Sequence, residues 1–258
     1  MDSLVELLGQ PAGVLIPLAI AITVGGVIKG ITAIGLPTVT ISFAITFHLL
    51  PPKEAIALVV VPIIVTNLWQ AIRAHGRIDP LKRFWPLIAV FLVCLWIGSK
   101  LLAVMNTHLL FAILGSAVAV FAASNLWKPR PHPITPGTER WAGPVAGVIG
   151  GLLGGTTTIW GPPLMMYFVL LKLTKDEWIR TIGMVWFTGA IPLAVFYWQN
   201  GILNPSNVYL SAAACVPGMV GILIGEQIRK VINEEAFRRV MLFILFLFGL
   251  NLIRRAIF

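Results

Sequence analysis

Long apolar stretches, separated by short polar connections, follow one another along almost the whole chain, and no other feature limits its fold so strongly. Several of them reach about 15–25 residues, close to the ~20 that a helix needs to cross a bilayer. Only 11% of the residues are charged, against about 25% in soluble domains, so the chain could not cover a soluble surface. We therefore expect an all-α polytopic membrane protein with the lipid bilayer as its solvent.

The basic residues are expected to set topology rather than to bind nucleic acid. The net charge is +9, which in a soluble protein would suggest a nucleic-acid partner. Here Lys and Arg stand mostly at the ends of apolar stretches, where they orient membrane helices. The histidines lack metal-ligand spacing, and no nucleotide-binding loop, nucleophile motif or carboxylate pair is present. We expect no nucleic-acid partner, cofactor, metal or enzymatic activity.

A tandem duplication is indicated by residues that recur 125 positions later in the chain. The turn at 76–80 recurs at 201–205 in the same way. The other matched pairs are Gly25-Gly26 with Gly150-Gly151, Gly30 with Gly155, Thr32 with Thr157, and Ile34 with Ile159. We predict a first membrane repeat in residues 1–128, a cytoplasmic linker in 129–140 and a second repeat in 141–258.

The charges of the loops predict that the two repeats are inverted relative to each other. The loop around 73–83 carries four Lys or Arg residues, whereas its partner around 199–207 carries none. The next pair reverses this bias, with one Lys around 100–108 and four basic residues around 226–239. Because basic loops stay in the cytoplasm, equivalent loops fall on opposite sides of the membrane. This arrangement is typical of inverted repeats in transporters.

Each repeat is expected to contain a hairpin of two short helices followed by three transmembrane helices. The transmembrane helices are predicted at 53–74, 84–104 and 108–127, and again at 178–199, 206–228 and 237–256. The hairpin arms are predicted at 14–28 and 37–50, and at 141–153 and 163–172. Such arms are about 15–22 Å long, too short for the ~30 Å hydrocarbon core. A broken, re-entrant hairpin is therefore expected, with two tilted full crossings as the alternative.

Glycine and proline in the middle of each hairpin mark a candidate substrate-binding site. Backbone freed from a helix inside the membrane must be satisfied by protein or by a water-filled cavity, and matched breaks point to a transporter's site. Pro37 and Pro163 stand near the start of each second arm, a position that proline favours. Helix starts expose N–H groups and carry partial positive charge, so the site is expected to suit a small anion.

The predicted substrate-binding residues come from both breaks and from the span 53–74. They are Lys29, Gly30, Thr32, Gly35, Pro37, Thr38, Asn67, Gln70, Gly155, Thr156, Thr157, Thr158, Trp160, Gly161 and Pro163. Each group also has an alternative role. The glycines could serve close helix packing, and Lys29 could neutralise hairpin carbonyls without touching substrate. Asn67 and Gln70 could join helices by hydrogen bonds, and Trp160 could pack rather than gate.

These residues together resemble the sulfite exporter TauE/SafE family of bacterial membrane permeases. The resemblance covers nearly the whole chain: a Gly-rich break, the spans after it and GRID at 76–79, and then GGLLGG at 150–155 and GILN at 201–204. Lys29, Ala33 to Gly35 and Thr156 to Thr158 replace part of the glycine runs of the family pattern. The resemblance implies export of a small anion, such as sulfite, sulfoacetate or a related organosulfonate or carboxylate, across the bacterial cytoplasmic (inner) membrane.

Three functions stay open at this point. The first is a secondary transporter or facilitator that exports an anion, the second a proton- or cation-coupled importer, and the third a membrane assembly factor or sensor. No carboxylate lies deep in a predicted span, so a proton relay has no obvious residue. An inside-negative potential would itself drive anion export, by about 2.3 kcal/mol per charge per 100 mV. A homo-oligomer is compatible with all three.

Overall fold

The computed structural model describes residues 9–73, 79–126, 136–171, 173, 175–231 and 234–257, and within these ranges it contains helices and no strand. The expected all-α class is therefore confirmed. Five described helices are long and apolar enough to cross a membrane, which makes the protein multi-pass. They are Ala12–Thr32, Pro52–Arg73, Trp85–Val104, Arg180–Gln199 and Val208–Ile228.

The chain forms two compact units, and each draws helices from both sequence halves. Unit 1 comprises residues 1–63, 105–128 and 201–258, and unit 2 comprises residues 64–104 and 129–200. The division into repeats at 1–128 and 141–258, and their inversion, stay predictions. The linker at 129–140 lies partly outside the described residues, and its last five positions already belong to a helix that begins at Pro136.

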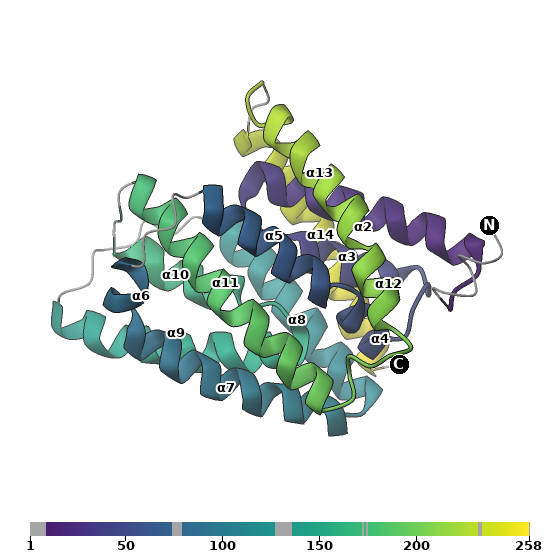
Figure 1. Ribbon diagram of the computed structural model, residues 1–258, viewed down its shortest axis with the longest axis horizontal. Coiled ribbons are helices and arrows are strands. Elements are labelled where there is room, and N and C mark those ends of the chain that lie inside the picture. Colours follow the sequence, from purple (N-terminus) through teal and green to yellow (C-terminus); the bar gives the residue numbers. More distant parts are fainter. Residues whose placement is uncertain are drawn as a thin grey trace. The chain divides into compact units, whose positions relative to one another are not determined.

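The helices of unit 1 and unit 2 are labelled in Figure 1. Unit 1 holds α2 (Ala12–Thr32), α3 (Leu36–Thr46), α4 (Pro52–Leu58), α8 (Thr107–Leu126), α12 (Val208–Ala213), α13 (Cys215–Ile228) and α14 (Glu234–Ile257). Unit 2 holds most of α5 (Val60–Arg73), then α6 (Asp79–Arg83), α7 (Trp85–Val104), α9 (Pro136–Thr157), α10 (Gly161–Leu170) and α11 (Lys175–Gln199).

In unit 1, α2 and α13 lie side by side with their backbones in direct contact (Figure 1). A Cβ on Gly26 or Gly30 would clash with carbonyl oxygens of α13, and a Cβ on Gly221 or Gly225 would clash with carbonyl oxygens of α2. Small residues at four-residue spacing allow this approach, and in lipid such packing replaces the missing hydrophobic force between helices. The glycine run is thus a contact surface between two membrane helices.

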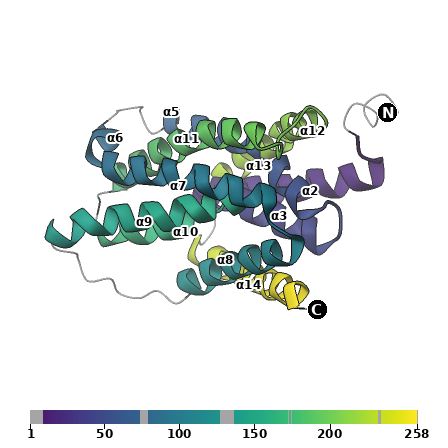
Figure 2. The same cartoon turned by 90° about the horizontal axis from the view of Figure 1, so that it is seen from below.

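Unit 2 repeats this arrangement between α9 and α7, which Figure 2 shows side by side. A Cβ on Gly147 would stand 2.7 Å from the Leu87 carbonyl oxygen, and one on Gly155 would clash with the carbonyl oxygen of Leu95. The expectation that the runs 25–30 and 150–155 interrupt their helices is therefore wrong. Glycine lowers helix propensity by only about 1 kcal/mol, and the close packing of a second helix outweighs this cost.

Pro62 removes one backbone hydrogen bond where α4 meets α5, and a serine from another part of unit 1 replaces it. Pro62 has no N–H to donate to the Leu58 carbonyl one turn earlier, which is where α4 ends. Ser211 of α12 donates its hydroxyl to that carbonyl at 2.9 Å and accepts the Val61 N–H at 3.1 Å. Both polar groups are thus satisfied inside the apolar interior of the unit.

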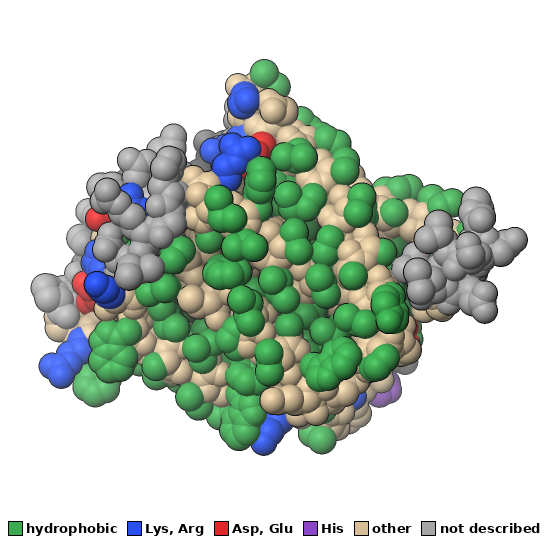
Figure 3. Space-filling model, viewed as in Figure 1, with side chains coloured by type: hydrophobic (Ala, Val, Ile, Leu, Met, Phe, Trp, Pro, Cys, Tyr) green, Lys and Arg blue, Asp and Glu red, His purple; other side chains and the backbone are tan. Residues whose placement is uncertain are grey.

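The outer faces of the helices fit a lipid environment. In Figure 3, hydrophobic side chains cover most of the visible surface of α13 in unit 1, and most of that of α11 and α7 in unit 2. Large apolar side chains are exposed along these helices, including Val216, Leu223, Val195 and Trp96. Exposed apolar area of this extent is expected where acyl chains replace water.

Candidate functional site: two interrupted helix hairpins

Each hairpin is interrupted over three residues, and the two interruptions stand 125 positions apart. The first comprises Ala33 to Gly35, between α2 and α3, and the second comprises Thr158 to Trp160, between α9 and α10. Ala33 and Thr158 have nearly equal, left-handed backbone angles, with φ of 67° and 62°. Since non-glycine residues rarely adopt this conformation, the match supports a common origin for the two segments.

The arms of the hairpins are unequal, which corrects the expectation of two short arms. The first arms, α2 and α9, contain 21 and 22 residues, or about 30 Å at 1.5 Å per residue. The second arms, α3 and α10, contain 11 and 10 residues, or about 15 Å. Each interruption therefore lies at the end of a helix of full membrane length and at the start of a short one.

Carbonyl groups at the first interruption are satisfied locally. The Ala33 N–H donates to the Lys29 carbonyl at 2.7 Å. The Thr32 hydroxyl lies 2.8 Å from both the Ile28 and the Ile34 carbonyl oxygens, which it bridges. Gly35 then adopts φ 112°, where a Cβ would press against the Ile28 side chain at 3.0 Å. A glycine is needed here to turn the chain into α3.

The second interruption satisfies its carbonyls with the threonine run. Thr156 and Thr157 donate their hydroxyls back to carbonyls of the preceding turn, at 2.8 Å and 2.6 Å. The Thr158 N–H donates to the Gly154 carbonyl at 2.8 Å. Tyr197 of α11, a fully buried residue, donates its phenol hydroxyl to the Gly155 carbonyl at 2.9 Å. The four threonine hydroxyls at the two interruptions, those of Thr32, Thr156, Thr157 and Thr158, are all bonded to nearby carbonyls.

The helix starts that follow the interruptions have no side-chain cap in the described structure. Gly35 and Trp160 are the capping positions of α3 and α10, and neither accepts a first-turn N–H with its side chain. In α3, the N–H groups of Leu36 and Thr38 precede the first bond of the helix, from Val39 to the Gly35 carbonyl at 2.9 Å. In α10, two of the first three positions are proline, so only Gly161 contributes an N–H.

Hydrogen-bond donors at both interruptions are the N–H groups at the starts of the short helices. The carbonyls described above accept hydrogen bonds, whereas the N–H groups at the starts of α3 and α10 receive no side-chain cap. The helix dipole places about half a positive charge at the start of α3 and of α10, and about half a negative charge at the ends of α2 and α9 that precede them. Lys29, only 6% exposed, stands one turn before the first interruption. Its position in the second hairpin is taken by Gly154, which packs against the Trp160 side chain.

The remaining predicted residues in unit 2 form helix contacts. Asn67 is buried and donates its side-chain amide to the Trp186 carbonyl at 3.3 Å, which joins α5 to α11. The Trp186 ring in turn lies 3.8 Å from a Cβ built on Gly161, at the start of α10. Trp160 is 3% exposed and makes an edge-to-face contact with Phe91 at 5.9 Å between ring centroids. These contacts agree with the packing alternatives, and a role of Asn67 or Trp160 toward a substrate stays a prediction.

The predicted residues divide between the two units. Unit 2 holds Asn67 and Gln70 together with the second interruption, and Trp186 connects Asn67 to the start of α10. Gln70 lies at the same helix crossing, where Gly183 of α11 approaches its backbone carbonyl. Unit 1 holds the residues of the first interruption, where Pro37 and Thr38 open α3. Their roles toward a substrate stay predictions.

Sequence reasoning named Thr38 but missed Thr40, Ser42 and Tyr197, whose buried hydroxyls lie in or beside the hairpins. In α3, the run Thr38, Thr40 and Ser42 is 4%, 0% and 0% exposed. Tyr197 was missed because a tyrosine in an apolar stretch resembles an interfacial anchor. The signal for α3 was present, since three hydroxyl residues at alternate positions inside an apolar stretch are unexpected unless they face protein or a cavity.

Comparisons with known proteins identify the family of the chain. Residues 18–252 match the family described as sulfite exporter TauE/SafE. No curated protein and no solved structure matches the chain. The match includes both interruptions, and of the five helices that are long and apolar enough to cross a membrane it leaves out only the first six residues of α2. This multi-pass membrane protein therefore belongs to the sulfite exporter TauE/SafE family of membrane transporters.

Proposed function

We propose that the protein is a secondary transporter or facilitator that exports a small anion across the bacterial cytoplasmic membrane. One observation carries the proposal: both interrupted hairpins satisfy carbonyls locally while the helix starts beside them have no side-chain cap. Backbone N–H groups and a helix dipole favour negative charge. A cation transporter would instead need the freed carbonyls as ligands.

The substrate class proposed is a small oxyanion, such as sulfite, sulfoacetate or a related organosulfonate or carboxylate. Membership in the TauE/SafE family supports a sulfur oxyanion. An oxyanion can accept hydrogen bonds from several N–H groups. The first interruption offers the amides of Leu36 and Thr38, and the second offers the amide of Gly161. Lys29 adds a positive charge near one of the two hairpins.

Membrane potential is the proposed driving force. An inside-negative potential of 100 mV contributes about 2.3 kcal/mol per negative charge to export, a concentration ratio of roughly 50 at equilibrium. A facilitator of this kind needs no titratable coupling group. Coupled uptake is the competing mechanism, and it predicts that flux follows a proton or cation gradient.

The test uses purified protein in liposomes loaded with labelled sulfite or sulfoacetate. A potassium gradient with valinomycin clamps the potential, and efflux is followed at equal pH on both sides. We expect efflux to accelerate when the interior is negative and to compete with unlabelled sulfonates, but not with organic cations. Protein-free liposomes give the background. Efflux that ignores the potential but follows a pH gradient would favour coupled transport, and no flux with any anion would refute a transport function.

A further inference from the structure

The end of α3 closes with a complete backbone cap that places a histidine at its turning point. The Leu49 N–H donates to the Ala44 carbonyl at 2.8 Å, and the His48 N–H donates to the Ile45 carbonyl at 3.1 Å. This pair of bonds defines a Schellman motif, whose turning residue has left-handed angles and is usually glycine. Here His48 occupies that position with φ 54°, so the backbone conformation fixes the position from which its side chain extends.

An arginine from the far end of the chain completes this cap. Arg255, in the last turn of α14, donates one guanidinium nitrogen to the Ile45 carbonyl and the other to the Thr46 carbonyl, both at 2.9 Å. Last-turn carbonyls have no partner inside their own helix, and a cation there also complements the helix dipole. Arg255 therefore fastens the end of the first hairpin to α14, within unit 1.

The same guanidinium contacts the imidazole of His48. Arg255 Nη2 lies 2.8 Å from His48 Nε2. A guanidinium can only donate hydrogen bonds, so Nε2 must be the acceptor and the ring must be neutral, with its proton on Nδ1. Protonation would remove this acceptor and place a second positive charge beside Arg255. Histidine is the side chain that ordinarily makes this change between about pH 5 and 8.

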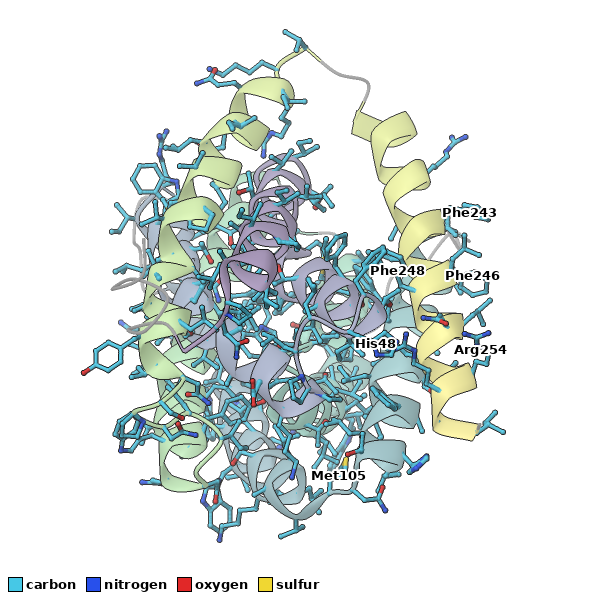
Figure 4. All side chains as sticks on the ribbon, turned by 90° about the vertical axis from the view of Figure 1, so that its right-hand side faces the viewer. His48, Met105, Phe243, Phe246, Phe248 and Arg254 are labelled. Carbon is cyan, nitrogen blue, oxygen red and sulfur yellow. The ribbon has the colours of Figure 1, made fainter. Side chains whose placement is uncertain are left out.

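Two neighbouring basic or histidine side chains contact other groups. Arg254, which projects from the opposite side of α14 in Figure 4, donates to Asn251 at 3.1 Å. The His108 ring of α8 lies 3.4 Å from the Ala256 carbonyl. Within the described ranges no ion pair joins His48 to a carboxylate. The titratable groups on the packed helices are Lys29 on α2, Lys53 and Glu54 on α4, and His108 on α8, together with Glu234, Glu235, Arg238, Arg239, Arg254 and Arg255 on α14.

We infer that Arg255 and His48 form a proton-sensitive latch on the short arm of the first hairpin. The latch is closed while His48 is neutral, when the guanidinium holds two carbonyls and the ring together. It loosens when pH falls and His48 gains its proton, because one hydrogen bond is lost and two cations then adjoin. Arg255 is a positioning residue for α3, and only the consequence for transport rests on the proposed function.

Amide hydrogen exchange measures the latch without any transport. The probes are the amides of Phe47, His48 and Leu49, in protein embedded in lipid nanodiscs. After correction for the chemical exchange rate, we expect their protection in the unmodified protein to fall about tenfold between about pH 7.5 and 5.5. His48→Asn should show equal protection at both pH values, since asparagine tolerates left-handed angles and does not titrate. Arg255→Gln should show low protection at both.

The control is Arg254→Gln, which removes a neighbouring positive charge that makes no contact with the cap. It should keep the wild-type pH dependence. The latch is refuted if His48→Asn retains that dependence or if Arg255→Gln leaves protection unchanged at the higher pH. Anion efflux at the two external pH values forms a second readout, which should change for the unmodified protein and not for His48→Asn. Absence of efflux at every pH would contradict the proposed function, while the exchange data would still decide the latch.

Discussion

The two hairpins share a skeleton but differ in the polar groups placed on it. Both place a left-handed residue after a long helix, both bond a threonine hydroxyl back to that helix, and both follow with a short helix whose start has no side-chain cap. Lys29 appears only in the first hairpin, whereas the second has Gly154 at that position and Trp160 in place of Gly35. The shared features are those that any interruption in lipid requires.

The differences show where substrate preference can be set without disturbing the fold. The first short arm is rich in buried hydroxyls, such as Thr38 and Ser42, and its end is held by Arg255. The second short arm is enclosed by aromatic rings, since Trp160 packs on Phe91 and Phe168 lies 6.3 Å from Trp186. The first hairpin therefore offers hydroxyl groups and a lysine, whereas the second offers a rigid apolar surface.

The largest effects are expected where the two hairpins are most alike, at their glycine contacts. Gly225→Ala in unit 1 and Gly155→Ala in unit 2 each place a methyl group against a carbonyl oxygen of the facing helix. Each should destabilise the protein by about 3 kcal/mol, as overpacking does, with a lower thermal unfolding temperature in detergent. Gly13→Ala is the control, because nothing lies within 4 Å of its Cβ position. If either variant melted like Gly13→Ala, the shared packing would be refuted for that unit.

The asymmetric charge should have the next largest effect. Lys29→Gln is expected to lower anion efflux at sub-saturating substrate about tenfold, the loss expected for one charge-assisted hydrogen bond. Divalent anions should lose more than monovalent ones. Lys100→Gln is the control, since that lysine is exposed and stacks on Trp96 at 3.7 Å. Unchanged efflux in Lys29→Gln would assign Lys29 to packing and make the two hairpins functionally more alike.

The smallest effects should come from the shared threonines. Thr32→Val and Thr157→Val keep the side-chain shape but remove the hydroxyl that bonds the helix end. Each should lower efflux about two- to fivefold, in line with about 1 kcal/mol for a neutral hydrogen bond. Thr23→Val removes an equivalent bond, to the Ala19 carbonyl at 2.8 Å, in the middle of α2 and should be neutral. Equal losses of efflux in all three variants would show that the threonines at the interruptions have no special role in transport.

The sequence predicted the helical class, the approximate bounds of the helices that follow each hairpin and the two interrupted segments, because hydropathy and proline or glycine placement act over short distances. The end of the α7 helix at Val104 and the end of α11 at Gln199 match the predicted spans. The role of Gly26 and Gly30 was mistaken, because a glycine that breaks a helix and one that admits a neighbour look identical without the neighbour. Arg255 could not be assigned either, since its partners lie about 210 positions away.

The glycine contacts join each hairpin to a helix from the other sequence half: α2 to α13, and α9 to α7. A protein made from either half alone would carry a glycine groove with no helix of its own to fill it. The two halves must therefore associate in the bilayer before either is fully packed. Because both halves are synthesised as one chain, each hairpin always has its partner helix available.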